Sequence, residues 1–234
     1  LEAGGRLAIV DAGIGLQDTA QPLERIGRAA IDAAGFQFHE RLTAVRQIER
    51  LGFRTADVTD IVLTHADADH VGGLADFPNA SVHLSAEELA SVTAAHARYS
   101  AAQFSHGPRW VTHSRSPVRW FGTEARPLPP LAGAEAFLVP LFGHPLGHCG
   151  VAIRSEKSWL LHLGDAYYLR AELTDEDHPV AALAAARADD DAMRRESLDV
   201  LRRLTQDHGN EIAMCGYHDF TQFPLGFTDE SPAS

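Results

Sequence analysis

Residues 64–70 read Thr-His-Ala-Asp-Ala-Asp-His and follow a short apolar run at 61–63 that predicts a buried strand. The segment places two histidines and two aspartates close together, directly after that strand. Metal binding requires neutral imidazole nitrogens and carboxylate oxygens in one place, and this set of donors suits zinc, manganese or iron rather than calcium. The pattern therefore predicts a metal-binding cradle formed by His65, Asp67, Asp69 and His70.

Strands and helices are predicted to alternate along the rest of the chain. Short apolar or β-branched runs predict strands at 7–10, 61–64, 82–84, 135–140, 149–154, 158–163 and 211–215. Apolar residues at helical spacing predict helices over 26–33, 45–51 and 193–204. Ser85 and Glu88 have the spacing of a capping box, which predicts the start of a further helix.

The periodicity fades between residues 98 and 133, where prolines and glycines are frequent. Long irregular inserts in a compact domain are usually functional or flexible loops. Its aromatic residues, among them Trp110 and Trp120, would suit the apolar wall of a substrate pocket. We therefore expect a single domain over residues 1–234 with an insert at about 98–133.

Charge and hydropathy narrow the range of partners. The chain has 20 Lys and Arg against 32 Asp and Glu, a net charge of -12, without a basic cluster that could neutralise phosphates. It also lacks an apolar run of the roughly 18 residues that a membrane span requires. We therefore expect a small-molecule substrate as partner, and neither nucleic acid nor a membrane; the sequence does not indicate an oligomeric state.

Cysteine usage bears on the compartment. Cys149 and Cys215 are too few for a disulfide scaffold in a chain of this size. We expect two small buried side chains, with a disulfide between them as the alternative. We therefore expect a reducing, cytoplasmic location. Because the chain begins at Leu1, the natural protein could also have a preceding segment such as a signal peptide.

Three further motifs follow the cradle: Gly-His-Pro-Leu-Gly-His at 143–148, Leu-Gly-Asp at 163–165 and Tyr-His-Asp at 217–219. Together with the cradle and the Gly-Gly-Leu at 72–74, they resemble the signature of metallo-β-lactamase-fold hydrolases. The resemblance extends over about residues 7–220, with the motifs in the family's order. It implies an α+β fold, the four-layer αββα sandwich, in which two sheets pack face to face, helices cover the outside and the site lies along one edge.

The resemblance also implies two divalent metal ions, with zinc as the first choice. The ligands it assigns to the first ion are His65, Asp67 and His148. Those assigned to the second ion are Asp69, His70 and His218, with Asp165 between the two ions. Such an ion pair lowers the pKa of a shared water to give a metal-bound hydroxide, which Asp69 would orient before it protonates the leaving group.

Asp67 departs from the family pattern, which usually has a histidine at this position. A carboxylate oxygen can roughly match the reach of the nearer ring nitrogen, and it makes the site harder and more negative. Manganese and iron therefore become alternatives to zinc. The other interpretation is that Asp67 lies beside a weakly occupied site without binding the ion. His144, four residues before His148, is expected to fix its loop by a hydrogen bond.

Tyr168 lies three residues after Asp165. Lactonases of the family that open acyl-homoserine lactones carry a tyrosine there, which touches the substrate carbonyl. The adjacent Tyr167 competes for this assignment, and either ring could instead serve packing. The resemblance thus implies hydrolysis of a small-molecule ester, best represented by lactone opening, with Asp69 and Tyr168 as catalytic residues.

Other functions use the same pattern. A thioester hydrolase of the glyoxalase II type and an iron-dependent persulfide oxygenase have the same scaffold. A protein of another class, which binds a ligand through a degenerate metal site without catalysis, would also retain the motifs. Metal content separates the last interpretation from the others.

Overall fold

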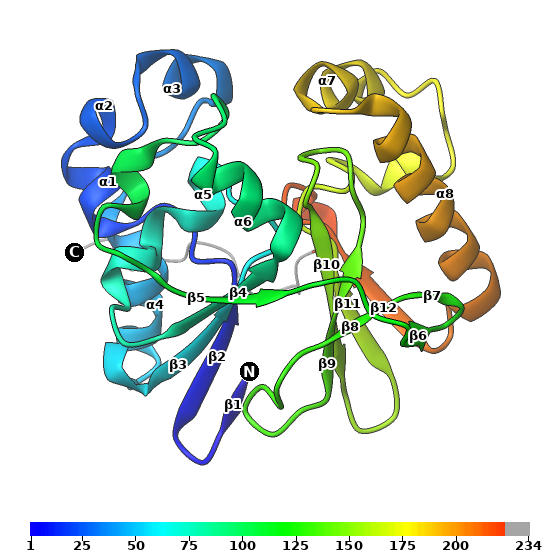
Figure 1. Cartoon of the computed structure of the whole chain (residues 1–234), viewed down its shortest axis with the longest axis horizontal. Helices are drawn as coiled ribbons and strands as arrows, with labels where there is room; N and C mark the ends of the chain where they lie inside the picture. Colours follow the sequence, from blue (N-terminus) through cyan, green and yellow to red (C-terminus); the bar gives the residue numbers. More distant parts are fainter. Residues whose placement is uncertain (223–234) are drawn as a thin grey trace.

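The computed structural model describes residues 1–222, in which two five-stranded sheets pack face to face with helices on both outer sides (Figure 1). This arrangement confirms the predicted four-layer αββα sandwich. Residues 223–234, part of the predicted single domain, lie outside the described residues.

The first sheet contains β1 to β5 in the order of the chain, and all its strands except β1 run parallel to their neighbours. Its strands are β1 (Glu2–Ala3), β2 (Arg6–Val10), β3 (Val58–Val62), β4 (Ser81–Ser85) and β5 (Arg109–His113). Because parallel strands end at the same edge, the segments that follow β2 and β3 meet there. Residues 64–70 are one of them.

The second sheet has the order β12-β11-β10-β9-β8 and is antiparallel apart from the β11–β12 pair. Its strands are β8 (Arg126–Pro127), β9 (Ala136–Pro140), β10 (Cys149–Arg154), β11 (Trp159–His162) and β12 (Ile212–Cys215). All seven predicted strands are present; β10 has the predicted bounds, and the other six differ by a few residues at their ends.

Helices cover both outer faces (Figure 1). The helices on the side of the first sheet are α1 (Leu16–Ala20), α2 (Pro22–Arg25), α3 (Arg28–Ala34), α4 (Ala44–Arg50), α5 (Ala68–Val71) and α6 (Ala86–Thr93). Those on the side of the second sheet are α7 (Val180–Arg187) and α8 (Asp191–His208), and Asp190 Oδ1 caps α8 by accepting the Met193 N–H at 3.0 Å. Within residues 1–222, none of the helices combines the length and apolar character needed to cross a membrane.

Three clusters of buried apolar side chains fill the interfaces between the layers. Alternate residues of one strand serve different clusters, because side chains on a strand point to opposite faces. On β2, for example, Leu7 packs in the cluster under α4 and α6, whereas Ala8 packs between the two sheets. On β11, Leu161 packs under α8, where Leu198 and Leu201 cover it.

The predicted insert at 98–133 is the connection between the two sheets and contains strands of both. It contributes β5 to the first sheet, the small β6–β7 ribbon (Arg119–Trp120 and Thr123–Glu124) and β8 of the second sheet. Trp120 is buried against Trp159, with ring centroids 5.5 Å apart, and Trp110 packs against Phe104. The expectation that these tryptophans line a substrate pocket is therefore wrong. Trp120 belongs to the apolar cluster under α8, and Trp110 packs against the cluster under α4 and α6.

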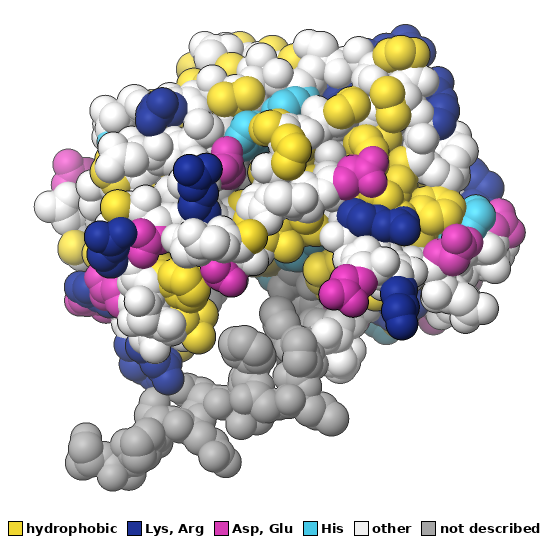
Figure 2. Space-filling model, turned by 90° about the horizontal axis from the view of Figure 1, so that it is seen from below, with side chains coloured by type: hydrophobic (Ala, Val, Ile, Leu, Met, Phe, Trp, Pro, Cys, Tyr) yellow, Lys and Arg dark blue, Asp and Glu magenta, His cyan; other side chains and the backbone are white. Residues whose placement is uncertain are grey.

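Figure 2 shows the face that is lowest in Figure 1. Lys and Arg side chains stand apart on it and alternate with Asp and Glu, while hydrophobic side chains gather toward its middle. On this face, charges of both signs are therefore interspersed. The absence of nucleic acid among the partners stays a prediction.

Leu161→Ala is expected to lower the free energy of unfolding by about 2–5 kcal/mol, because the fully buried side chain leaves a cavity in the cluster under α8. Its neighbour Leu160 lies on the same strand and is 39% exposed, so Leu160→Ala is the matched control. Urea unfolding measures both. Equal losses in the two variants would contradict this description of the core.

Candidate metal centre

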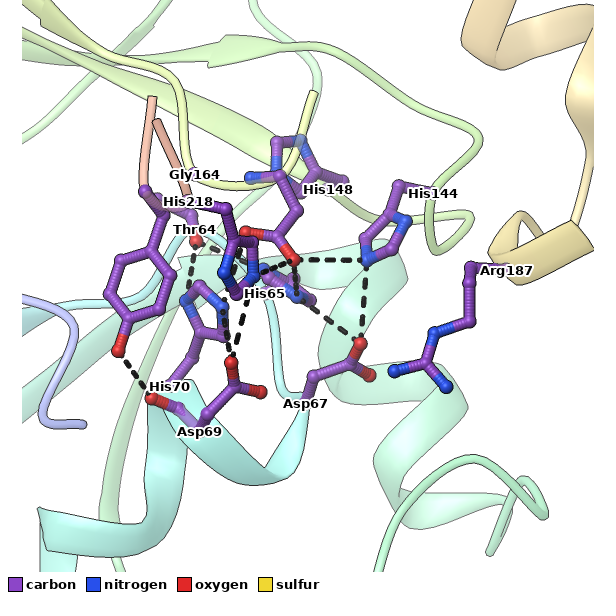
Figure 3. Close-up of polar contacts among 12 residues, drawn as sticks. Thr64, His65, Asp67, Asp69, His70, His144, His148, Gly164, Arg187 and His218 are labelled. Carbon is purple, nitrogen blue, oxygen red and sulfur yellow. Dashed lines mark hydrogen bonds and ion pairs between the residues drawn. The ribbon is translucent and has the colours of Figure 1, made fainter. Parts of the chain in front are cut away.

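The candidate site lies at one edge of the sandwich, where strands of both sheets end (Figure 3). His65 and Asp67 follow β3, and the short helix α5 then carries Asp69 and His70. The second sheet contributes the rest from the segments after β9, β11 and β12. These residues are His144, His148, Asp165 and His218.

One group of donors gathers around Asp67. Its Oδ2 atom lies 3.4 Å from the Nε2 atoms of both His65 and His144. His144 Nε2 is in turn 3.4 Å from Asp165 Oδ2. An ion bound at about 2.0–2.2 Å from each ligand places tetrahedral ligand atoms about 3.4 Å apart, so these separations fit a first metal ion.

A second group gathers around Asp165 and α5. His218 Nε2 lies 3.1 Å from Asp165 Oδ2, and His70 Nε2 lies 3.3 Å from Asp165 Oδ1. Asp69 Oδ2 is 3.7 Å from the Nε2 atoms of both His70 and His218. Asp165 thus faces both groups, as expected for a residue between two ions.

Unpaired polar atoms support a metal site here. His65 Nε2, His70 Nε2 and Asp165 Oδ1 are buried without a hydrogen-bond partner. A buried polar atom without a partner costs about 1–3 kcal/mol, and such atoms normally have a reason. The three residues also form one of the groups whose donor atoms lie within 4.8 Å of one another. The donor set therefore fits divalent metal ions at this edge.

Among the described residues, His148 lies beside the donors but outside the three groups whose donor atoms lie close together, so its role as a ligand stays a prediction. Its Nδ1 lies 3.0 Å from the Leu141 carbonyl oxygen, and its Nε2 accepts the Asp165 backbone N–H at 3.1 Å. Because both ring nitrogens have backbone partners, His148 holds the loop of Asp165 in place. His144, expected to fix its loop by a hydrogen bond, lies in one group with His65 and Asp67.

Gly164 allows this close approach. Its φ is +52°, and a Cβ atom there would lie 2.6 Å from Thr64 Oγ1 and 2.8 Å from His148 Nε2. Any larger residue would therefore push the Asp165 backbone away from His148. The glycine of the Leu-Gly-Asp motif has this steric role.

Asp11 is a functional residue that the sequence analysis missed. Its Oδ2 lies 2.7 Å from His70 Nδ1, and its Oδ1 accepts the Thr64 backbone N–H at 2.8 Å. Burial raises the pKa of Asp11, but the charge and hydrogen bond of His70 outweigh burial and lower it. Burial lowers the pKa of His70, yet the nearby carboxylates of Asp165 and Asp11 raise it well above its usual value. A carboxylate behind a ligand histidine fixes its ring and tautomer.

Arg98 was also missed. Its Nε donates to Asp67 Oδ1 at 2.5 Å, and its Nη2 donates to Asp67 Oδ2 at 2.6 Å. Burial acts to raise the pKa of Asp67, but His65, His144 and Arg98 together hold it well below its usual value. Asp67 is therefore an ionised carboxylate among the donors. Nothing in the local pattern of residues 98–133 indicated this contact, because it spans 31 positions of the chain.

The two tyrosines have different places. Tyr167 is fully buried in the core, and its hydroxyl donates to Gln222 Oε1 at 3.0 Å. Tyr168 instead lies over the donors, with ring centroids 5.7 Å from His144 and 5.3 Å from His218. Burial raises the pKa of Tyr168 to about 12, so its hydroxyl remains protonated near pH 7.

A cavity of about 420 Å³ opens over the donors. Its polar floor contains Asp67, Asp69, Asp165 and His218. Its walls come from α3 and the following loop on one side, and from Tyr168 and α7 on the other. The wall residues include Ala33, Ala34, Phe36, Val180, Leu183 and Arg187. The cavity thus combines a charged floor with a mostly apolar wall.

Glu88 supports the cradle from behind. Ser85 caps α6 by accepting the Glu88 N–H at 3.0 Å, but the Glu88 side chain does not complete the predicted capping box. Its Oε1 instead accepts the Ala66 N–H at 2.7 Å and the Tyr99 hydroxyl at 2.8 Å. Burial raises the pKa of Glu88 to about 7.

The two cysteines are free thiols, Cys149 buried and Cys215 half-buried. The alternative of a disulfide is therefore wrong for this structure. Burial raises the pKa of both thiols, which disfavours the reactive thiolate.

The family model described as the metallo-beta-lactamase superfamily matches residues 1–214. The chain belongs to this superfamily. Two curated relatives, from Mycobacterium tuberculosis and Mycobacterium bovis and both named as probable metallo-hydrolases, are 42% identical to it over 181 residues. That match covers 74% of this chain and 57% of each relative, so the chain spans little more than half of their length.

Solved structures share the fold. An N-acyl homoserine lactone hydrolase, with the product N-hexanoyl-L-homoserine at its catalytic metal centre, superposes with a TM-score of 0.67 at 21% identity, covering 92% of this chain and 77% of that one. A dizinc quorum-quenching lactonase gives 0.59 at 18% identity, covering 92% and 69%. At these identities the likeness shows the fold alone.

Asp11→Asn is expected to weaken zinc binding by about 10–100-fold, because an amide holds the His70 ring less firmly and lowers its basicity. Calorimetric titration of the metal-free protein measures the affinity. Asp60→Asn is the matched control, since Asp60 pairs with His83 at 3.0 Å outside the donor groups. Unchanged zinc affinity in Asp11→Asn would show that this contact does not tune the site.

Glu88→Gln tests the buried acid. In the wild type, the stability contributed by neutral Glu88 is present below pH 4.5 and is lost as pH rises through about 7. Between pH 5 and pH 8, metal-free wild type should therefore lose ~2–3 kcal/mol relative to Glu88→Gln, as measured by urea unfolding. Glu87→Gln is the control, because the Arg126 guanidinium lowers the pKa of Glu87. A constant difference over this range would contradict the raised pKa.

Proposed function

We propose that the chain is a metal-dependent hydrolase that opens a lactone or a similar small-molecule ester. The observation that carries the proposal is the cavity in which the donors form the floor, Tyr168 overhangs them and apolar residues form the wall. Its volume of about 420 Å³ lies in the range of small-molecule sites. The lactone hydrolases named above share the fold, which supports this substrate class.

Two divalent ions are proposed for the floor, with zinc as the first choice and manganese or iron as alternatives. His65, Asp67 and His144 would hold the first, and Asp69, His70 and His218 the second, with Asp165 between them. When bound, such ions supply Lewis acidity and make water more acidic.

The residues around the floor then have separate roles. Asp69 lies at the edge of the floor and can accept a proton from the attacking water and pass it to the leaving oxygen. Tyr168 donates a hydrogen bond to the substrate carbonyl oxygen, where negative charge develops. Arg187 lines the same cavity as Tyr168, and its guanidinium acts to lower the pKa of that hydroxyl against the effect of burial.

The apolar wall would contact the part of the substrate beyond its ester group. Phe36 extends from one side, while Val180 and Leu183 of α7 extend from the other. Leu183 is 55% exposed, which leaves apolar surface that an aliphatic chain can cover. We therefore propose a substrate with an apolar tail next to its ester group.

Tyr168→Phe is expected to lower kcat/KM for an acyl lactone about 100-fold, because it removes one donor to the developing oxyanion. The matched control is Tyr167→Phe, since that hydroxyl bonds Gln222 in the core, and we expect little change from it. Turnover is measured by the acid released from a panel of lactones, thioesters and phosphodiesters. Metal-loaded protein that hydrolyses none of them would refute the proposed activity.

A further inference from the structure

Arg98 lies against the first group of donors. Besides its two bonds to Asp67, its Nη2 atom lies 2.9 Å from His144 Nε2. The same Nη2 atom is therefore in contact with Asp67 Oδ2 and His144 Nε2. These are two of the atoms that face one another across the proposed first ion.

The guanidinium and an ion compete for these atoms. A guanidinium nitrogen can only donate hydrogen bonds, so His144 Nε2 must accept with its single lone pair. A lone pair used in that way is not available to a metal ion. In addition, an ionised Asp67 whose two oxygens are bound by Arg98 has most of its charge compensated.

Arg98 is held from its other side as well. Its Nη1 donates to the Arg187 carbonyl oxygen at 2.7 Å and to Asp189 Oδ1 at 3.2 Å. Only 14% of its side chain is exposed. The hydroxyl of the next residue, Tyr99, donates a hydrogen bond to Glu88, and this bond fixes the backbone beside Arg98. The Arg98 guanidinium is therefore held in a fixed position within the site.

The second group differs in its surroundings. Asp69 Oδ2 faces His70 and His218, each at 3.7 Å, and His70 is backed by Asp11. Two carboxylates, Asp69 and Asp165, face these histidines, so this group is strongly negative. The donor atoms of Asp69, His70 and His218 lie within 4.8 Å of one another.

From these contacts we infer that Arg98 is a built-in cation of the first metal position and makes the two positions unequal. The second position binds its ion tightly, and the first fills only when the ion displaces Arg98 from Asp67 and His144. The inference rests on the proposed metal-dependent function. Its chemical consequence is that one ion is bound at low free zinc and two at high free zinc.

Equilibrium dialysis at buffered free zinc concentrations, followed by elemental analysis, measures this. Wild type is expected to reach one equivalent and then to need at least about 10-fold more free zinc for the next. Arg98→Met removes the donors while keeping a long side chain, and both equivalents should then bind over one concentration range. Cobalt absorption spectra give a second readout that is independent of activity.

Controls separate the outcomes. Arg126→Met removes another buried arginine, which pairs with Glu87 away from the donors, and should leave the wild-type pattern. Arg98→Gln provides a second variant if the Met variant is unstable. Wild type that binds two ions with equal affinity, or an Arg98 variant with weaker binding at the first position, would overturn the inference. Absence of any metal in all variants would instead refute the proposed function.

Discussion

A buried carboxylate at the end of β2 organises this edge of the molecule. Asp11 has a φ of 54°, unusual for a residue with a side chain, and such strain persists only where the surroundings fix it. Here its two oxygens bind Thr64 and His70, so the ends of β2 and β3 are joined through one side chain. The direction of the His70 ring, and with it the second group of donors, depends on that carboxylate.

The remaining donors come from the other sheet, so the site exists only when both sheets are packed. His144, Asp165 and His218 extend from loops of the second sheet toward residues fixed to the first. The apolar cluster between the sheets, which includes Val62 and Val151, holds the two halves together. Metal binding and the packing of the sandwich are therefore thermodynamically linked.

Local patterns predicted the strands and the 64–70 cradle, because these depend on neighbours in the sequence, whereas the four-layer sandwich came from the resemblance to the family. The resemblance assigned His148 as a ligand and His144 as a loop-fixing residue, but the side chain of His144 also turns toward Asp67 and Asp165, because the fold of their shared loop sets the direction of both rings. Asp11 stood visibly between a strand and a glycine, but its partners lie more than 50 positions away. Arg98 was missed, and the role of Trp110 and Trp120 was misjudged, because their contacts depend on how the connection between the two sheets folds.

The pairing of Asp67 with Arg98 also constrains how this site can change over generations. A histidine at position 67 would leave Arg98 as a buried cation beside other positive or neutral rings, without its two carboxylate bonds. In the metal-free protein, loss of Arg98 alone would leave the Asp67 charge uncompensated within the donor cluster. Each single substitution thus leaves one charge without its partner, whereas changing both residues does not. The two positions are therefore expected to vary together. A return to the common family pattern needs two substitutions.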